Sequence, residues 1–144
     1  MSMPSSTPPT QPSSAAAPAS QARILVVDDD DYVHVALRAA LRPLHANIER
    51  ATTAGEGLGL ARSQRPHLAI IDLGLPDADG YQLTRWLRAE PGFEELRILI
   101  VTGHLPDEQA ARDAGADDIL GKPFRLHEFL EAVRRQLGAR APAG

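Results

Sequence analysis

Apolar residues follow two alternating patterns through the middle of the chain. Short continuous apolar runs bounded by polar residues are typical of strands buried on both faces. Each run is followed by a stretch with apolar residues every three or four positions, which is typical of an amphipathic helix. The pattern predicts strands at residues 23–28, 46–50, 68–72, 97–102 and 119–120. It predicts helices at residues 31–42, after Thr53, after Asp79, at 106–114 and at 124–137.

Residues at the expected helix ends support this division. Thr53 and Asp79 are residue types that cap helix N-termini, and Gly115 is the preferred type just past a helix C-terminus. Five strand–helix units in succession predict an α/β fold with a doubly wound parallel sheet. In such sheets the ligand site lies at the carboxyl ends of the strands, so the residues that end the strands are the first candidates for chemistry.

Four expected strands end in residues that suit phosphate and metal chemistry. These are the run Asp28–Asp31, then Asp72, then Thr102 with Gly103, and then Lys122 with Pro123. Carboxylates gathered at one edge repel one another unless a cation joins them, and oxygen-only ligands suit Mg²⁺. A lysine, a hydroxyl and a small residue beside them provide a phosphate pocket. A carboxylate in that setting can accept a phosphoryl group.

Each of these residues also has a simpler interpretation. Asp30 and Asp31 stand where acidic residues cap a helix and stabilise its first turn, and this role is favoured for them. Asp72 taken alone can be a solvated loop residue, and Lys122 before a proline can belong to an exposed turn. The five histidines contain no pair at metal-binding spacing. A functional site is favoured because the aspartates, Thr102 and Lys122 all stand at the ends of expected strands.

In these stretches the chain resembles the receiver domain of two-component response regulators, including the chemotaxis-regulator type. The matching segments are ILVVDDDD (24–31), HLAIIDLGLPDADGYQL (67–83), ILIVTGH (98–104) and AGADDILGKPF (114–124). The resemblance implies a flavodoxin-like fold with five helices and strand order 2-1-3-4-5. It also implies a single-turnover phosphorylation switch rather than an enzyme.

The resemblance assigns a role to each matching residue. Asp72 corresponds to the phosphoacceptor, Asp29 to a direct Mg²⁺ ligand and Asp28 to one that acts through water. Gly74 corresponds to the position whose backbone carbonyl also ligates the metal, and Mn²⁺ is expected to substitute for Mg²⁺. The phosphate-binding positions are occupied by Thr102, Gly103 and Lys122, and the Lys122–Pro123 bond is expected to be cis.

The chain departs from the family at the position three residues before the lysine. The family often has Tyr or Phe there, whose ring turns inward on phosphorylation, but this chain has Ile119. Activation is therefore expected to rely on Thr102 and the loop that follows it. His104, two residues after Thr102, is either a solvated loop residue or a group that tunes access of water to the aspartyl phosphate.

Composition divides the chain into one domain and two tails. Residues 1–22 contain five prolines and no charge, so we expect a disordered tail there. Residues 23–138 form the expected receiver domain, and 139–144 a short flexible tail.

The net charge of −4 without a basic block argues against nucleic-acid binding. The chain has neither a secretory signal nor a run of about 18 apolar residues, so a cytoplasmic protein without a membrane partner is expected.

The interpretation favoured by the sequence is a stand-alone receiver. Its expected partners are a histidine kinase or a histidine phosphotransfer protein, and a downstream target that binds roughly residues 105–137. The alternatives are a phosphorylation-independent interaction module and a receiver cut from a hybrid histidine kinase. A small phosphatase or nucleotide binder is disfavoured, because Asp72 begins DLG instead of DxD and no glycine-rich strand-to-helix turn is present.

Removal of residues 1–22 is expected to leave the domain folded. The segment has no apolar periodicity, so its loss should change the free energy of unfolding by no more than ~0.5 kcal/mol, the usual scale of a surface change. Urea and thermal denaturation of the full chain and of a chain beginning at residue 23 measure this. A melting temperature several degrees lower in the shorter chain would contradict the prediction.

Overall fold

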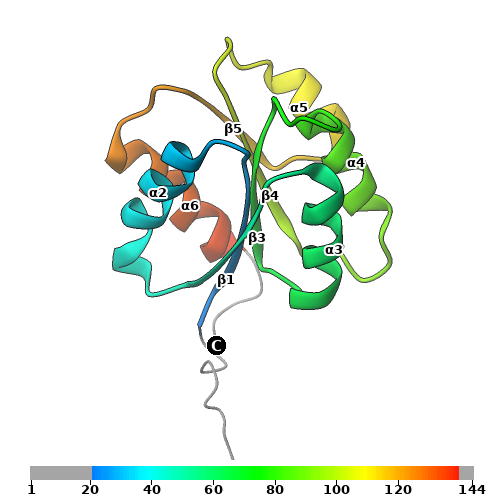
Figure 1. Ribbon diagram of the computed structural model, residues 1–144, viewed down its shortest axis with the longest axis horizontal. Coiled ribbons are helices and arrows are strands. Elements are labelled where there is room, and N and C mark those ends of the chain that lie inside the picture. The colour runs from blue at the N-terminus through cyan, green and yellow to red at the C-terminus, as the bar shows by residue number, and fades with distance from the viewer. Residues whose placement is uncertain (1–20, 140–144) are drawn as a thin grey trace, which may run out of the picture.

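The protein is described by a computed structural model covering residues 21–139. It contains the predicted parallel sheet of five strands, in the order β2-β1-β3-β4-β5 that the resemblance implies. Helices cover both faces of the sheet, as Figure 1 shows. The strands are β1 (Arg23–Val27), β2 (Asn47–Ala51), β3 (Leu68–Asp72), β4 (Arg97–Thr102) and β5 (Asp118–Gly121).

Five α-helices and one short 3₁₀ helix lie between the strands or after the last one within these residues. They are α2 (Asp31–Ala40), η1 (Arg42–Leu44), α3 (Ala54–Gln64), α4 (Gly80–Ala89), α5 (Glu108–Ala114) and α6 (Leu126–Ala139). Helices α2 and α6 lie on one face of the sheet, and α3, α4 and α5 lie on the other (Figure 1). The expected doubly wound arrangement is therefore confirmed.

Burial on both faces explains why the central strands read as continuous apolar runs. All five residues of β3 are buried. Successive residues alternate between two cores, with Ala69 and Ile71 packed under α3 and α4 and Leu68 and Ile70 packed under α2 and α6. Because a strand's side chains alternate between faces, a strand between two helical layers needs an apolar residue at every position.

Capping side chains fix several helix starts. Thr53 Oγ1 accepts a hydrogen bond from the Glu56 N–H at 3.0 Å, and Asp79 Oδ1 accepts one from the Gln82 N–H at 2.8 Å, as their positions predicted. Gly115 follows α5 with a left-handed φ of 106°. The helix predicted from residue 106 begins at Glu108, because Asp107 caps it by accepting from the Ala110 N–H.

The last helix likewise begins later than predicted, at Leu126 instead of residue 124. Phe124 still packs with the core and stacks on Phe129 with ring centroids 5.2 Å apart. Its apolar character therefore extended the helical pattern beyond the helix. Within residues 21–139, no helix combines the length and apolar character needed to cross a membrane.

Two residues assigned to the N-terminal tail contact the domain. The Ala22 carbonyl accepts from the Asn47 N–H at 2.8 Å, and the Gln21 side chain donates to the His45 carbonyl at 3.0 Å. The rest of that tail, residues 1–20, and residues 140–144 lie outside the described residues. A chain beginning at residue 21 retains both bonds, so comparing it with one beginning at 23 separates their effect from that of the tail.

Candidate functional site

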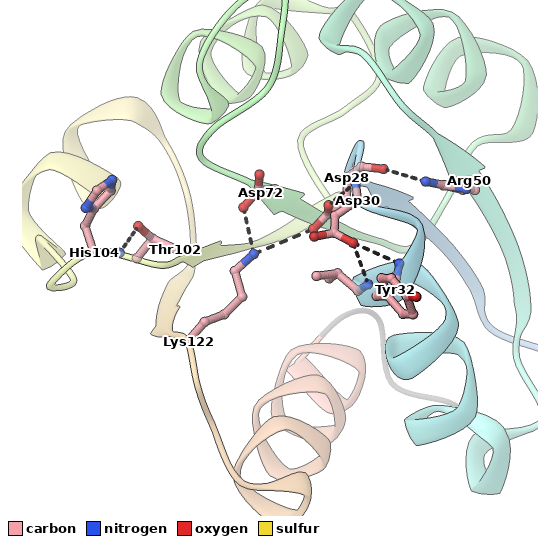
Figure 2. A network of polar contacts seen from close by, with 9 residues as sticks. Asp28, Asp30, Tyr32, Arg50, Asp72, Thr102, His104 and Lys122 are labelled. Atoms are coloured by element: carbon pink, nitrogen blue, oxygen red, sulfur yellow. Dashed lines mark hydrogen bonds and ion pairs between the residues drawn. The ribbon is translucent and has the colours of Figure 1, made fainter.

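The parallel strands bring the predicted residues together at one edge of the sheet. Asp28 follows β1, Asp72 ends β3 and Lys122 follows β5. Lys122 Nζ lies 3.1 Å from Asp72 Oδ1 and 3.8 Å from Asp28 Oδ2. Figure 2 shows the ammonium group between the two carboxylates. Residues separated by up to 94 positions thus form one constellation because the carboxyl ends of parallel strands share an edge.

Asp28, Asp29 and Asp72 form an acidic cluster in which carboxylate oxygens lie within 4.8 Å of one another. Asp28 is only 1% exposed and Asp72 9%, whereas Asp29 is exposed. Asp28 Oδ1 accepts a hydrogen bond from the Asp30 N–H at 2.9 Å. Asp28 Oδ2 is buried and accepts no hydrogen bond from the described residues, although buried polar atoms are normally satisfied.

The environment disfavours a negative charge on Asp28. Burial raises the pKa of its carboxyl above the ordinary value, and the negative charges of Asp72 and Asp29 raise it further. The Asp30 N–H and the Lys122 ammonium act in the opposite direction without overcoming the increase. A cation bound between these carboxylates would reverse this balance by favouring the charged form.

The acidic cluster fits a divalent cation such as Mg²⁺. It offers only oxygen ligands, and Asp28 Oδ2, which has the Lys122 ammonium at 3.8 Å but accepts no hydrogen bond from the described residues, is a buried acceptor that a cation would satisfy. Gly74 lies close by, since a Cβ built on it would stand 3.7 Å from Asp72 Oδ2. The exposure of Asp29 leaves one side open to water, which Mg²⁺ usually retains in its coordination shell.

The other two phosphate-binding candidates, Thr102 and Gly103, lie at the carboxyl end of β4, which pairs with the strand that ends in Asp72. Thr102 ends β4 and is buried, and its Oγ1 accepts a hydrogen bond from the His104 N–H at 3.0 Å. The Lys122 N–H donates to the Thr102 carbonyl at 2.6 Å, so the ends of β4 and β5 are tied together. A Cβ on Gly103 would meet nothing within 4 Å, and the Lys122–Pro123 bond is cis.

Ile119, which stands where the family often has an aromatic ring, and His104, the candidate tuning residue, are placed differently. Ile119 is buried on β5, opposite Ile100 of β4, and packs in the core under α3, α4 and α5. His104 is exposed, and Figure 2 shows its ring on the far side of Thr102 from Asp72. In this conformation the imidazole does not face the phosphoacceptor candidate.

The structure adds Arg50, which the sequence reasoning did not single out. Its guanidinium pairs with Asp31 at 2.8 Å and donates to the Asp28 carbonyl at 3.3 Å. Asp30 caps α2 by accepting from the Tyr32 and Val33 N–H groups, as the simpler interpretation predicted. Arg50 stands next to the last residue of β2, so a search of the ends of all five strands would have found it.

An apolar groove of about 530 Å³ opens beside Lys122, separate from the acidic cluster. It runs between α2 and the segment that leads into α6, and Lys122 is its one charged residue. Its lining consists of Val33, Ala36, Leu37, Ala40, Lys122, Pro123, Phe124 and Leu126. The groove brings no further reactive group to the edge, so the chemistry rests on the carboxylates, Lys122 and Thr102.

Sequence comparison matches residues 24–134 to the response regulator receiver domain family. Response regulator MprA of Mycolicibacterium vanbaalenii is 39% identical over 122 residues, which cover 83% of this chain and 52% of that protein. MprA of Mycobacterium avium is 38% identical over the same length, which covers 53% of that protein. The chain thus spans about half the length of the curated relatives it matches.

Solved structures show the same architecture. A response regulator from Chloroflexus aurantiacus superposes with a TM-score of 0.77 at 35% identity, covering 82% of this chain and 98% of its own. The receiver domain of a sensor histidine kinase from Pseudomonas aeruginosa, which has a magnesium ion coordinated in its active-site cleft, superposes with a TM-score of 0.74 at 28% identity. That match covers 83% of this chain and 99% of the other. By sequence, topology and the residues gathered at the sheet edge, this chain belongs to the response regulator receiver domain family.

Proposed function

We propose that the domain accepts a phosphoryl group on Asp72 from a histidine kinase or a histidine phosphotransfer protein. The observation that carries this proposal is the position of Lys122 Nζ, 3.1 Å from Asp72 Oδ1, beside two further carboxylates. Lysine neutralises the charge of an incoming phosphoryl group, and the acidic cluster supplies ligands for a divalent cation. Both components are needed where a carboxylate attacks a phosphorus atom surrounded by negative oxygens.

The transfer exchanges one bond to phosphorus for another. An Asp72 carboxylate oxygen attacks the phosphorus of a phosphohistidine, a new O–P bond forms, and the N–P bond breaks with its electron pair returning to the imidazole. Lys122 stays protonated and pairs with a phosphoryl oxygen. Thr102 lies at the end of the adjacent strand, where its hydroxyl can donate to a second oxygen, and Gly103 leaves room for the group. Slow hydrolysis of the acyl phosphate returns the carboxylate, so the domain acts as a switch and not as a multiple-turnover enzyme.

The bound cation would be Mg²⁺, with Mn²⁺ as a substitute. Asp29 and Asp72 would coordinate it directly, Asp28 through water, and Gly74 through its backbone carbonyl. The cation supplies neutralisation of the phosphoryl oxygens during transfer. The buried Asp28 Oδ2 without a hydrogen-bond donor and the placement of Gly74 beside Asp72 support this ligand set.

Phosphorylation would be read through altered protein contacts. We assign the output to residues 105–137, because this segment starts in the loop after Thr102 and includes α5, β5 and α6. A receiver that had been part of a hybrid kinase would use the same chemistry at Asp72, whereas a phosphorylation-independent module would not require it.

Asp72 is expected to be the sole site of acyl phosphorylation. Incubation with acetyl phosphate and Mg²⁺ should add the mass of one phosphoryl group to the wild type and none to Asp72→Ala. Chelation of Mg²⁺ should prevent the addition. Asp31→Ala, which removes an exposed carboxylate outside the acidic cluster, is the control and should still be phosphorylated. Intact-mass spectrometry gives the readout, and a phosphorylated Asp72→Ala chain would contradict the assignment.

Asp28→Asn is expected to stabilise the metal-free domain at neutral pH. It removes a buried charge while an oxygen remains to accept from the Asp30 N–H, so the free energy of unfolding should rise by about 1 kcal/mol, the usual size of a single-residue effect. The raised pKa of Asp28 makes folding favour its protonated form. The wild type therefore loses stability relative to the variant as the pH rises above 3.8, the ordinary pKa.

Urea denaturation across this pH range measures the difference, with the exposed Asp113→Asn as the control. The variant's advantage should disappear in acid, where Asp28 of the wild type is protonated. Saturating Mg²⁺ should stabilise the wild type more than Asp28→Asn. An equal stability of the two chains at all pH values would show that Asp28 bears no electrostatic cost.

Activation is expected to reorganise the loop after Thr102 and not β5. Ile119 has no ring to turn and a branched side chain with few rotamers. When beryllofluoride binds Asp72, Thr102 should turn toward it and disturb the bond its hydroxyl accepts from the His104 N–H. The largest amide shift changes should therefore fall at residues 102–108.

Thr102→Ala should leave Asp72 phosphorylatable and reduce those shift changes. Thr84→Ala, which removes another buried threonine hydroxyl, controls for general destabilisation. NMR with and without beryllofluoride compares the three chains. Shift changes centred on Ile119, with residues 102–108 unaffected, would refute this mechanism.

A further inference from the structure

Asp77 connects the loop after Asp72 to the start of a different helix. Its Oδ1 accepts a hydrogen bond from the Ala54 N–H at 2.8 Å, and its Oδ2 accepts one from the Gly55 N–H at 2.9 Å. We call this pair of bonds the Asp77 clamp. Ala54 and Gly55 are the first two residues of α3, 23 and 22 positions earlier in the chain.

The clamp completes the capping of α3. The first N–H groups of a helix have no partner within it, and they form its positive end. Thr53 Oγ1 accepts from the Glu56 N–H, and Asp77 accepts from the two N–H groups that precede it. The Gly55 and Ala54 N–H groups lower the pKa of the Asp77 carboxyl, so it is charged and the clamp is closed at neutral pH.

The clamped loop is the one that carries Gly74. It leaves β3 at Asp72 and ends at Asp79, which caps α4. Near its beginning, the Leu73 N–H donates to the Val101 carbonyl at 3.0 Å, and the Gly80 N–H donates back to the Leu73 carbonyl at 2.9 Å. These bonds fix the two ends of the loop, and the Asp77 clamp fixes the part between them to α3.

We propose that Asp77 is a positioning residue for the divalent-cation site: the Asp77 clamp holds Gly74 beside Asp72. A side-chain ligand can reach a metal by rotating, but a backbone carbonyl goes only where its loop places it. Glycine permits more backbone conformations than other residues, so the loop's conformation at Gly74 depends strongly on its external anchors. This inference rests on the proposed function, in which Gly74 and the acidic cluster bind Mg²⁺.

Mg²⁺ affinity is the quantity that tests the Asp77 clamp. Asp77→Ala removes both hydrogen bonds and should weaken Mg²⁺ binding by about tenfold, the lower end of the range for groups that orient metal ligands. Asp77→Asn keeps one oxygen acceptor, so its Mg²⁺ affinity should fall between those of the wild type and Asp77→Ala. Thr53→Ala is the matched control, because it removes a cap from the same helix without touching the loop, and its Mg²⁺ affinity should equal that of the wild type. Isothermal titration calorimetry with MgCl₂ measures all four chains.

Hydrogen exchange provides a second readout. If Asp77 had a purely structural role, its removal would not change the effect of Mg²⁺ on this exchange. Because coupling between two sites is reciprocal, Mg²⁺ should slow exchange of the Ala54 and Gly55 amides in the wild type. The effect should persist in Thr53→Ala and disappear in Asp77→Ala. If Asp77→Ala does not fold, Asp77→Asn gives the same comparison with a smaller effect.

The outcomes separate this inference from the function on which it rests. If the wild type binds Mg²⁺ and Asp77→Ala binds it with the same affinity, the Asp77 clamp does not position the site. The proposed function would remain intact in that case. Equal losses of affinity in Asp77→Ala and Thr53→Ala would trace the effect to α3 stability and overturn the inference as well. A wild-type chain that binds no Mg²⁺ would overturn the cation site itself.

Discussion

The candidate site depends on apolar strands that hold like charges close together at one edge of a parallel sheet. Asp28, Asp29 and Asp72 lie within reach of one cation, and Lys122 is the positive charge that contacts two of them. Burial and mutual repulsion make this arrangement costly, as the raised pKa of Asp28 shows. The apolar strands on both sides of the sheet offset that cost, since they fix the strand ends regardless of what the carboxylates prefer.

Most of the fold could be predicted because its signals are local. The run LAIID gave the bounds of β3 correctly, and caps such as Thr53 and Asp79 marked the beginnings of helices. One error occurred where apolar periodicity extended beyond the end of a helix. Apolar Phe124 extended the pattern of α6 by two residues, although the helix begins at Leu126. Apolar periodicity records burial, whereas hydrogen bonding determines where a helix starts.

The candidate site was predictable to the extent that its residues end strands. Asp28, Asp72 and Lys122 follow from the rule that carboxyl ends of parallel strands meet. Arg50 and Asp77 were missed for different reasons. Arg50 lies next to the last residue of β2, a strand with a weak apolar pattern, and its partners Asp28 and Asp31 lie on another segment. Asp77 lies in a loop and contacts two helix residues that precede it by more than 20 positions, a separation over which no sequence period operates.

The two loops that flank Asp72 are held differently, and in the proposed function this difference would determine where a response occurs. The loop containing Gly74 is fixed to β4 by Leu73 and to α3 by Asp77, so a ligand at the edge meets a rigid support there. The loop after Thr102 begins at Gly103, around which a Cβ would meet open space. In the proposed function, a phosphoryl group on Asp72 would engage the Thr102 hydroxyl, which accepts a hydrogen bond from the His104 N–H of the second loop. Because displacement follows the weaker restraint, this contact would direct the response toward α5.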